Sequence, residues 1–349
     1  MKFVAVRRFV RKAKELRSRI RKFVAMERAR SPEPFKAPRL LAKGFFSQRK
    51  ILYGFERYKR TCYISDWEIE FNLGGINDPI AKQVLANKLY FHLSLPREYN
   101  KHFIGFINRN CFKSFSTFES MDSALERFGR IFVKPADGRS GNGIRVFGTS
   151  EFEVNGPHVV EEPIIAHQYS SGIYPESINS IRIITLRDNN GGFIAGAAHR
   201  FGSRMTGFID NFSKGGIAAY IDSDSGVMAT GRSNPGVYPT SFHKTHPDTG
   251  EPIEGVCVPY WSEVKDLALK LSELFSDLFY VGWDIAVTPD GPVVIEGNSG
   301  VANPNLIQAH KPLLTSERVT SFFEAHGVIS KRHAKQCRAA FRTYGRTKK

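Results

Sequence analysis

Residues 280–298 carry a strong β-hairpin signal. Two apolar runs, Tyr280–Val287 and Pro292–Gly297, flank the turn sequence Thr288–Gly291. Turn-forming residues between two such runs predict an antiparallel pair of strands. Hairpins of this kind, interleaved with helical segments, favour an α+β fold over a doubly wound parallel sheet.

Polar residues on this hairpin predict a cation site. Centring the turn predicts three cross-strand pairs: Asp284 with Glu296, Gly282 with Asn298, and Ala286 with Val294. Because side chains alternate between faces, Asp284, Glu296 and Asn298 share one face of the sheet. Two facing carboxylates and an amide oxygen suit Mg²⁺, with Mn²⁺ as an alternative. The competing interpretation is that both acids are solvated on an exposed face.

A glycine-rich loop follows the run Ile131–Lys134 and precedes a second run, Ile144–Phe147. Its backbone could surround phosphate oxygens at Gly138, Ser140, Gly141 and Gly143. A P-loop or dinucleotide fold would place a helix after the glycines, and neither pattern is met. Lys134 just before the loop favours a phosphate clamp over an ordinary hairpin turn.

A second hairpin is predicted from runs 180–187 and 193–200, which flank Asp188–Gly192. Arg182 and Arg200 fall on the same face of this hairpin, within reach of each other's long side chains. They are candidates for stabilising a transferred phosphoryl group. Surface solvation is the alternative.

Other segments have weaker patterns. Apolar spacing predicts helices over 78–95 and 263–279. The run 158–165 predicts a strand.

The net charge of +16 is concentrated at the two ends. Residues 1–60 carry +16 and residues 331–349 carry +8, so the remaining body is mildly acidic. A nucleic-acid binder should carry its basic face on the folded core, so no nucleic-acid partner is expected. We expect a basic helical N-terminal extension (1–60), a catalytic region (61–330) and a basic tail (331–349). The catalytic region would divide into a nucleotide flap, about 115–165, and a metal and substrate subdomain, about 166–330.

Residues 2–30 predict an amphipathic helix, with arginines and lysines opposite an apolar stripe, ending at Ser31-Pro32. Such a helix could lie on anionic lipid, giving peripheral contact at the inner membrane face. Alternatively, its apolar stripe packs on the protein body or on a second subunit, so an oligomer stays open. Four widely spaced cysteines and no run of 18 apolar residues fit a cytoplasmic protein.

In chain order, several motifs resemble the ATP-grasp superfamily, and more closely its sugar-transfer-associated branch of glutamate-ligase-like carboxylate–amine ligases. The similar segments are Asn87-Lys88-Leu89, Lys134 with its glycine loop, Val160–Ile164, Ser177–Arg182, Asp210–Gly216, Gly282-Trp283-Asp284 and Glu296-Gly297-Asn298. The resemblance covers about residues 76–312 and implies two α+β subdomains that clamp ATP.

The resemblance also implies residue roles. Lys88, Lys134 and the glycine loop would contact ATP phosphates, with Asp284, Glu296 and Asn298 as metal ligands. The remaining nucleotide contacts would come from Glu161, Glu162 and Ile164 of the adenine hinge, Gln168 at the ribose position, and Asn211.

The implied activity is ATP-dependent ligation of a small-molecule carboxylate and an amine through an acyl phosphate. A sugar- or lipid-linked substrate in surface polysaccharide biosynthesis would fit this branch. A kinase on the same fold and a non-catalytic nucleotide-binding module are the alternatives. Asp284→Asn is expected to leave folding nearly unchanged and to abolish turnover.

Overall fold

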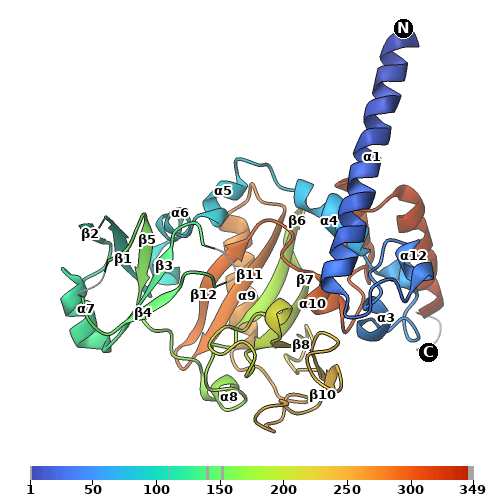
Figure 1. Ribbon diagram of the computed structural model, residues 1–349. Coiled ribbons are helices and arrows are strands. Elements are labelled where there is room, and N and C mark those ends of the chain that lie inside the picture. The colour runs from blue at the N-terminus through green and yellow to red at the C-terminus, as the bar shows by residue number, and fades with distance from the viewer. Residues whose placement is uncertain (1, 110, 139–140, 151–152, 345–349) are drawn as a thin grey trace. The chain divides into compact units, whose positions relative to one another are not determined.

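The structure is a computed structural model that describes residues 2–109, 111–138, 141–150 and 153–344 (Figure 1). The chain divides into two compact units. Unit 1 comprises residues 1–75, 235–241 and 308–349, and unit 2 comprises residues 76–234 and 242–307.

Unit 2 contains a seven-stranded antiparallel sheet with strand order β10-β9-β8-β7-β6-β11-β12 (Figure 1). Its strands are β6 (Ile181–Asp188), β7 (Gly191–Phe201), β8 (Ile217–Ile221), β9 (Gly231–Arg232), β10 (Phe242–His243), β11 (Tyr280–Thr288) and β12 (Gly291–Asn298). Both predicted hairpins are confirmed, since β6 pairs with β7 and β11 with β12. The sheet places the two hairpins side by side through the pairing of β6 with β11.

A five-stranded antiparallel sheet, ordered β2-β1-β5-β3-β4, forms the other sheet of unit 2. Its strands are β1 (Phe103–Asn108), β2 (Cys111–Ser114), β3 (Ile131–Pro135), β4 (Arg145–Phe147) and β5 (His158–Glu161). Ile104, Ile131, Val133 and Val160 form its apolar core. The strands predicted on either side of the glycine loop are therefore confirmed as β3 and β4.

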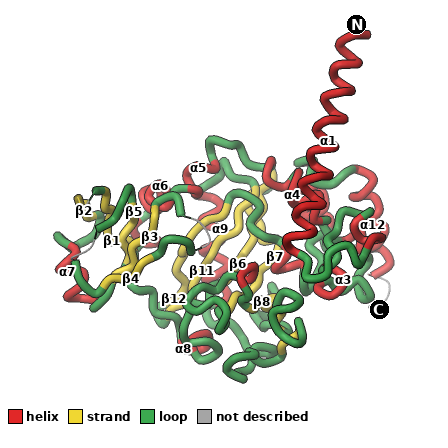
Figure 2. Tube along the Cα trace, viewed as in Figure 1, coloured by secondary structure: helices red, strands yellow, loops and turns green. Residues whose placement is uncertain are grey.

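Helices cover these sheets and connect their strands (Figure 2). They are α5 (Lys82–Ala86), α6 (Lys88–Ser94), η3 (Arg97–Tyr99), α7 (Met121–Phe128), α8 (Gln168–Ser171), η4 (Phe212–Lys214) and α9 (Trp261–Leu274). Helix α9 buries Trp261, Val264, Ala268 and Leu271, a helical spacing that faces the seven-stranded sheet.

Three predicted elements differ in extent from the observed ones. The helix predicted over 78–95 is interrupted at Asn87, whose extended backbone ends α5 and whose side chain caps the first turn of α6. The strand predicted over 158–165 ends at Glu161, because Pro163 has no N–H to donate to a sheet. The helix predicted over 263–279 ends at Leu274.

Unit 1 is helical. Its elements are α1 (Lys2–Arg30), α2 (Pro38–Leu41), α3 (Arg49–Leu52), η1 (Arg60–Cys62), α4 (Asp66–Phe71), η2 (Leu73–Gly75), α11 (Glu317–Ala325) and α12 (Lys331–Tyr344), while α10 (Asn305–Gln308) spans the boundary between the units. The predicted N-terminal helix and its end before Ser31-Pro32 are confirmed. Among the described residues, no helix combines the length and apolar character needed to cross a membrane.

A buried ion pair holds α3 to α4 within unit 1. Two guanidinium nitrogens of Arg49 donate to the Asp66 carboxylate, the shortest contact being 2.7 Å from Nη2 to Oδ1. Asp66 also accepts from the backbone N–H of Phe46 at 2.9 Å. Both side chains are almost completely buried.

We predict that Arg49→Met lowers the free energy of unfolding of unit 1 by about 3–5 kcal/mol, because it leaves the Asp66 carboxylate buried without its cation. Urea denaturation followed by tryptophan fluorescence measures the change. The control is Lys36→Met, which removes an exposed pair with Glu33 and should cost less than about 1 kcal/mol. Equal losses in the two variants would contradict the prediction.

Candidate active site

The acidic hairpin has the predicted register at its polar end. Asp284 lies opposite Glu296 and Gly282 lies opposite Asn298. The predicted pairing of Ala286 with Val294 is wrong. An irregularity between Asp284 and Ile285 shifts the register by one, so Ala286 faces Val293. The bulge leaves the positions of the three polar side chains unaffected.

Two arginines converge on Asp284 from neighbouring strands. Arg182, directly opposite Asp284 on β6, donates from Nε to Oδ1 at 2.5 Å and from Nη2 to Oδ2 at 3.0 Å. Arg200 on β7 places its Nη2 3.0 Å from Oδ2 of the same carboxylate. The two arginines predicted to share a face therefore meet at one buried carboxylate.

The two carboxylates of the hairpin have opposite pKa shifts. Burial would raise the pKa of Asp284, but the charges of Arg182 and Arg200 outweigh it and hold the pKa at about 2. Burial raises the pKa of Glu296, and the negative charge of Asp284 raises it further. Among the described residues Glu296 makes no ion pair within 4 Å. Its carboxylate accepts a 3.3 Å hydrogen bond from the Asn298 amide.

Arg200 also reaches a second acid, Asp210, which the sequence-based site omitted. Nη2 of Arg200 lies 3.4 Å from Asp210 Oδ1, and Asp210 Oδ2 accepts from the backbone N–H of Ser180 at 2.6 Å. Burial alone would lower the pKa of Arg200, but the charges of Asp210, Asp284 and Glu296 raise it. Its Nε is buried without a hydrogen-bond partner in the described structure. An unpaired buried donor at this point fits an anionic ligand.

Asn211, the predicted nucleotide contact, accepts from the backbone N–H of Ser213 at 2.9 Å and caps η4. Its neighbour Asp210 is the residue of this motif that joins the arginine cluster. The sequence signal for Asp210 was its place in the segment Asp210–Gly216.

Lys88 joins the glycine loop to the acidic hairpin. Its backbone N–H donates to the Ala136 carbonyl at 2.7 Å, and its ammonium group donates to the Gly138 carbonyl. Its positive charge also lowers the pKa of Glu296, against the larger effects that raise it. Lys88, at the first position of α6, therefore lies between the loop and the carboxylates.

The glycine loop requires glycine at two described positions. Gly141 and Gly143 have φ of 74° and 77°, in the left-handed region that other residues avoid. A Cβ on Gly143 would lie 2.8 Å from the Pro135 ring. Next to these glycines, Asn142 accepts from the Lys214 ammonium at 3.0 Å, so the loop reaches the segment Asp210–Gly216. The predicted contact Ser140 lies outside the described residues.

Lys134 forms an ion pair with the hinge residue Glu161, 2.5 Å from Nζ to Oε2. Beyond Glu161 the chain leaves the five-stranded sheet, and His167 N–H bonds to the Val287 carbonyl of the seven-stranded sheet at 2.8 Å. The side chains of Glu162 and Ile164 are partly exposed on this connection, and Gln168 is exposed at the start of α8.

The hairpin residues fit a hard divalent cation. Two facing carboxylates, one without an ion pair, and a neighbouring side-chain amide are the donors that Mg²⁺ accepts. In this state the Asn298 amide nitrogen faces Glu296. A half-turn of the amide would present its oxygen instead.

The segment that contains this site is similar to a known protein family. The family described as sugar-transfer associated ATP-grasp matches residues 148–308. Residues 148–308 are therefore similar to this family, and they include the acidic hairpin, Arg182 and Arg200. The predicted resemblance and the α+β ATP-grasp fold are thereby confirmed. Lys88, Lys134 and the glycine loop precede the matched segment, so their nucleotide roles remain predictions.

No curated protein sequence matches the chain. Among solved structures, D-alanyl-alanine synthetase A of Vibrio cholerae is similar with 14% identity and a TM-score of 0.39, over 75% of this chain and 66% of that one. Biotin carboxylase of Campylobacter jejuni has 11% identity and a TM-score of 0.42, over 73% and 49%. N5-carboxyaminoimidazole ribonucleotide synthetase of Thermotoga maritima has 10% identity and a TM-score of 0.34, over 65% and 49%. The chain thus spans less than two thirds of the length of each.

The geometry changes the expected effect of Asp284→Asn on folding. Loss of this carboxylate would leave the buried guanidinium groups of Arg182 and Arg200 without their shared anion. Removing one partner of a buried ion pair is strongly destabilising. We therefore expect Asp284→Asn to lower the stability of the fold. Glu296 is the better position for testing function.

We predict that Gly282→Ala destabilises unit 2 by about 1–3 kcal/mol through overpacking. The new Cβ would lie 2.7 Å from Ala302 Cβ and 3.0 Å from Arg182 Cδ. Gly300→Ala is the control, since nothing lies within 4 Å of its Cβ position, and it should change stability by less than about 0.5 kcal/mol. Urea denaturation compares the two, and a Gly282→Ala protein as stable as wild type would contradict the close packing around Arg182.

Proposed function

We propose that the chain is an ATP-dependent carboxylate–amine ligase that works through an acyl phosphate. The observation that carries this proposal is the shared face of four neighbouring strands, β7, β6, β11 and β12. It brings the carboxylates of Asp284 and Glu296 next to the guanidinium groups of Arg182 and Arg200. Such a face can hold a cation and phosphoryl oxygens at the same place.

In this proposal ATP lies between the glycine loop and the acidic hairpin. Lys88 and Lys134 bind phosphate oxygens, and the backbone of the loop closes over them. The hinge backbone at Ile164 binds adenine, while Glu161, Glu162 and Gln168 lie along the same connection. A divalent ion held by Asp284, Glu296 and Asn298 would supply positive charge beside the phosphates.

The reaction needs no nucleophilic side chain. A substrate carboxylate oxygen attacks the γ-phosphorus, the bond to the β-phosphate oxygen breaks, and ADP leaves. The amine nitrogen of the second substrate then attacks the acyl carbon, inorganic phosphate leaves, and the amine loses a proton to give the amide. Arg182 and Arg200 act by orienting and neutralising the transferred phosphoryl group.

We propose a sugar-linked or amino-acid carboxylate as the substrate, used in surface polysaccharide biosynthesis at the cytoplasmic side of the membrane. Support comes from the family description, sugar-transfer associated ATP-grasp. A kinase that phosphorylates a hydroxyl group could use the same site. Hydroxylamine trapping separates the two, because only the ligase yields a hydroxamate together with ADP.

We predict that Glu296→Gln lowers ATP turnover at least about 100-fold, because the cation and its phosphate lose a charged ligand. Stability should change by less than about 1 kcal/mol, since Glu296 has no ion pair to lose and its raised pKa already disfavours the charged form. Turnover is measured as ADP formed in the presence of candidate carboxylates and amines.

The control is Asp290→Asn, which changes an exposed acid at the turn of the same hairpin and should leave ADP formation at the wild-type rate. A Glu296→Gln protein that keeps wild-type turnover would show that this hairpin does not take part in the reaction. A wild-type protein that binds ATP with no turnover would favour the non-catalytic alternative.

A second proposal concerns contact between α1 and an anionic membrane surface. Part of the apolar stripe of α1 packs within unit 1. Phe23 stacks on Phe46 with ring centroids 4.9 Å apart, and Glu27 accepts from the Ser47 N–H at 3.1 Å. Four other apolar side chains of α1 are 39–52% exposed, namely Val10, Leu16, Ile20 and Val24.

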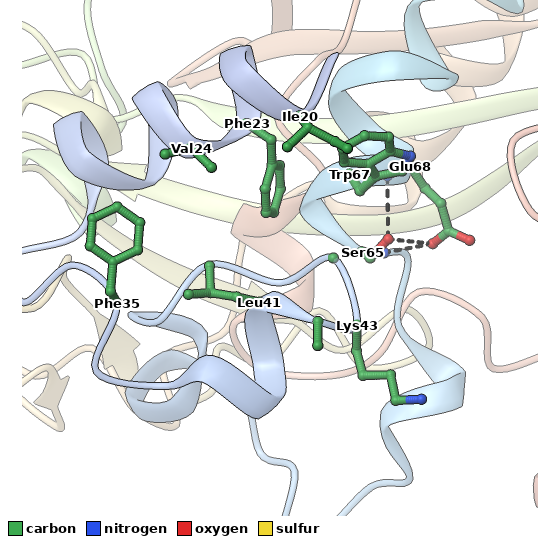
Figure 3. Close-up of a pocket in the computed structure, with 11 residues that line it drawn as sticks. Ile20, Phe23, Val24, Phe35, Leu41, Lys43, Ser65, Trp67 and Glu68 are labelled. Atoms are coloured by element: carbon green, nitrogen blue, oxygen red, sulfur yellow. Dashed lines mark hydrogen bonds between the residues drawn. The ribbon is translucent and has the colours of Figure 1, made fainter. Parts of the chain in front are cut away.

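The exposed stripe continues into a cavity of about 650 Å³, which is lined by Ile20 and Phe23 of α1 and also by Leu41 and Trp67 (Figure 3). Residues 2–30 carry 12 arginines and lysines against two acids. Basic side chains beside an apolar stripe are complementary to anionic headgroups and the acyl chains beneath them. Such contact would suit a lipid-linked substrate.

We predict that the double variant Val10→Glu/Leu16→Glu binds vesicles with 30% phosphatidylglycerol at least about tenfold more weakly than wild type, because two charges replace inserted apolar groups. Co-sedimentation measures binding. Both positions are exposed, so Phe23 and Glu27 keep their packing. Ile51→Glu, at an exposed apolar position outside α1, is the control, and equal binding by all three proteins would exclude contact through α1.

A further inference from the structure

Three side chains outside the acidic hairpin converge in the interior of unit 2. His92 comes from α6, His102 directly precedes β1, and Glu161 ends β5. One ligand atom from each lies within 4.8 Å of the others, and all three residues are no more than 2% exposed. Among the described residues this is the one such group of three histidine, cysteine or acidic side chains.

Asn100 determines which ring nitrogen of His92 carries the hydrogen. The Asn100 amide nitrogen donates to the His92 carbonyl at 2.7 Å, so its oxygen faces His92 Nδ1, 2.6 Å away. Nδ1 therefore carries the hydrogen, and in the neutral ring Nε2 has only a lone pair. This lone pair faces Glu161 Oε1 at 3.1 Å. Two acceptors in this arrangement require a cation or a proton between them.

His102 lacks the hydrogen bonds that a buried ring normally makes. Neither of its nitrogens has a partner in the described part of the chain, and Nε2 lies 4.0 Å from Glu161 Oε2. Burial lowers the pKa of His102 to about 3, so the ring is neutral and has a free lone pair. A buried polar group without a partner in the protein needs one from a bound ion, ligand or water.

We propose that His92, His102 and Glu161 form a Zn²⁺ site, separate from the predicted magnesium site on the acidic hairpin. Two imidazole nitrogens and a carboxylate oxygen are a ligand set that Zn²⁺ accepts. The hydrogen bond from His92 Nδ1 to Asn100 is the outer contact that orients a metal-bound histidine. Ligands about 2 Å from the ion are about 3.3 Å apart in a tetrahedral site, so side-chain movements of about 1 Å would close it.

Lys134 competes with the ion for Glu161. Its ammonium group is 2.5 Å from Oε2, while Oε1 faces His92. The ion binds through Oε1 of Glu161. The nearby positive charge of Lys134 lowers the affinity of the site for the ion. The site would join α6, the start of β1 and the end of β5, and so link the Lys88 helix to the hinge.

Zinc binding to the metal-stripped full-length protein tests the proposal, without nucleotide and with millimolar Mg²⁺ present so that the acidic hairpin does not contribute. Isothermal titration should give one Zn²⁺ per chain, and Co²⁺ should give the visible absorption of a four-coordinate site. His102→Gln should bind Zn²⁺ at least 30-fold more weakly, and Lys134→Met about tenfold more tightly.

His158→Gln is the matched control. This buried histidine lies on the same strand as Glu161, with Nδ1 bonded to the Gly156 carbonyl, and its loss should leave zinc affinity unchanged. Absence of stoichiometric zinc in the wild-type protein would overturn the site. So would equal affinity in wild type and His102→Gln, or a Lys134→Met protein that binds no more tightly than wild type.

Discussion

The candidate active site depends on the Asp284 carboxylate, which is buried and shared by two arginines from the neighbouring strands β6 and β7. A buried anion of this kind is stable only with its cations in place. The surrounding chain adapts to this arrangement. Gly282 leaves room for the Arg182 side chain, and Ala302 adopts a left-handed φ of 50° while its carbonyl accepts from Arg182 Nη1 at 2.6 Å. Backbone strain next to a charged cluster is typical of functional sites.

The sequence predicted this part of the fold because its information is local. Turn residues between alternating runs located both hairpins, and the period of two placed Asp284, Glu296 and Asn298 on one face. The pairing Ala286 with Val294 failed because a bulge changes register without leaving a clear trace in one sequence. The bulge lies on the far side of Asp284 from the polar pairs, so the site prediction was unaffected.

Other features depend on contacts between distant segments and could not be read from the sequence. Lys134, predicted as a phosphate ligand, also forms an ion pair with Glu161 between positions 27 residues apart in the chain. Asp210 reaches Arg200 only after β7 and the loop beyond it have folded back. Asn87 is the exception, because asparagine is a good N-cap, and it could have located the break between α5 and α6.

The charges of the site suggest how it changes when ligands bind. Asp284 Oδ2 already accepts from Arg182, from Arg200 and, at 3.5 Å, from Asn298, so a cation can reach it only if one donor leaves. Arg182 is held by two contacts to Asp284 and one to Ala302. Arg200 has one contact to Asp284, one to Asp210 and one to the Ser180 hydroxyl, and its Nε has no partner among the described residues. Arg200 is therefore the arginine that can turn to a phosphoryl oxygen at the lower cost in free energy. The arriving cation would replace its positive charge at Asp284, and the phosphate would accept a hydrogen bond from its Nε. By this exchange, nucleotide and cation binding would support each other.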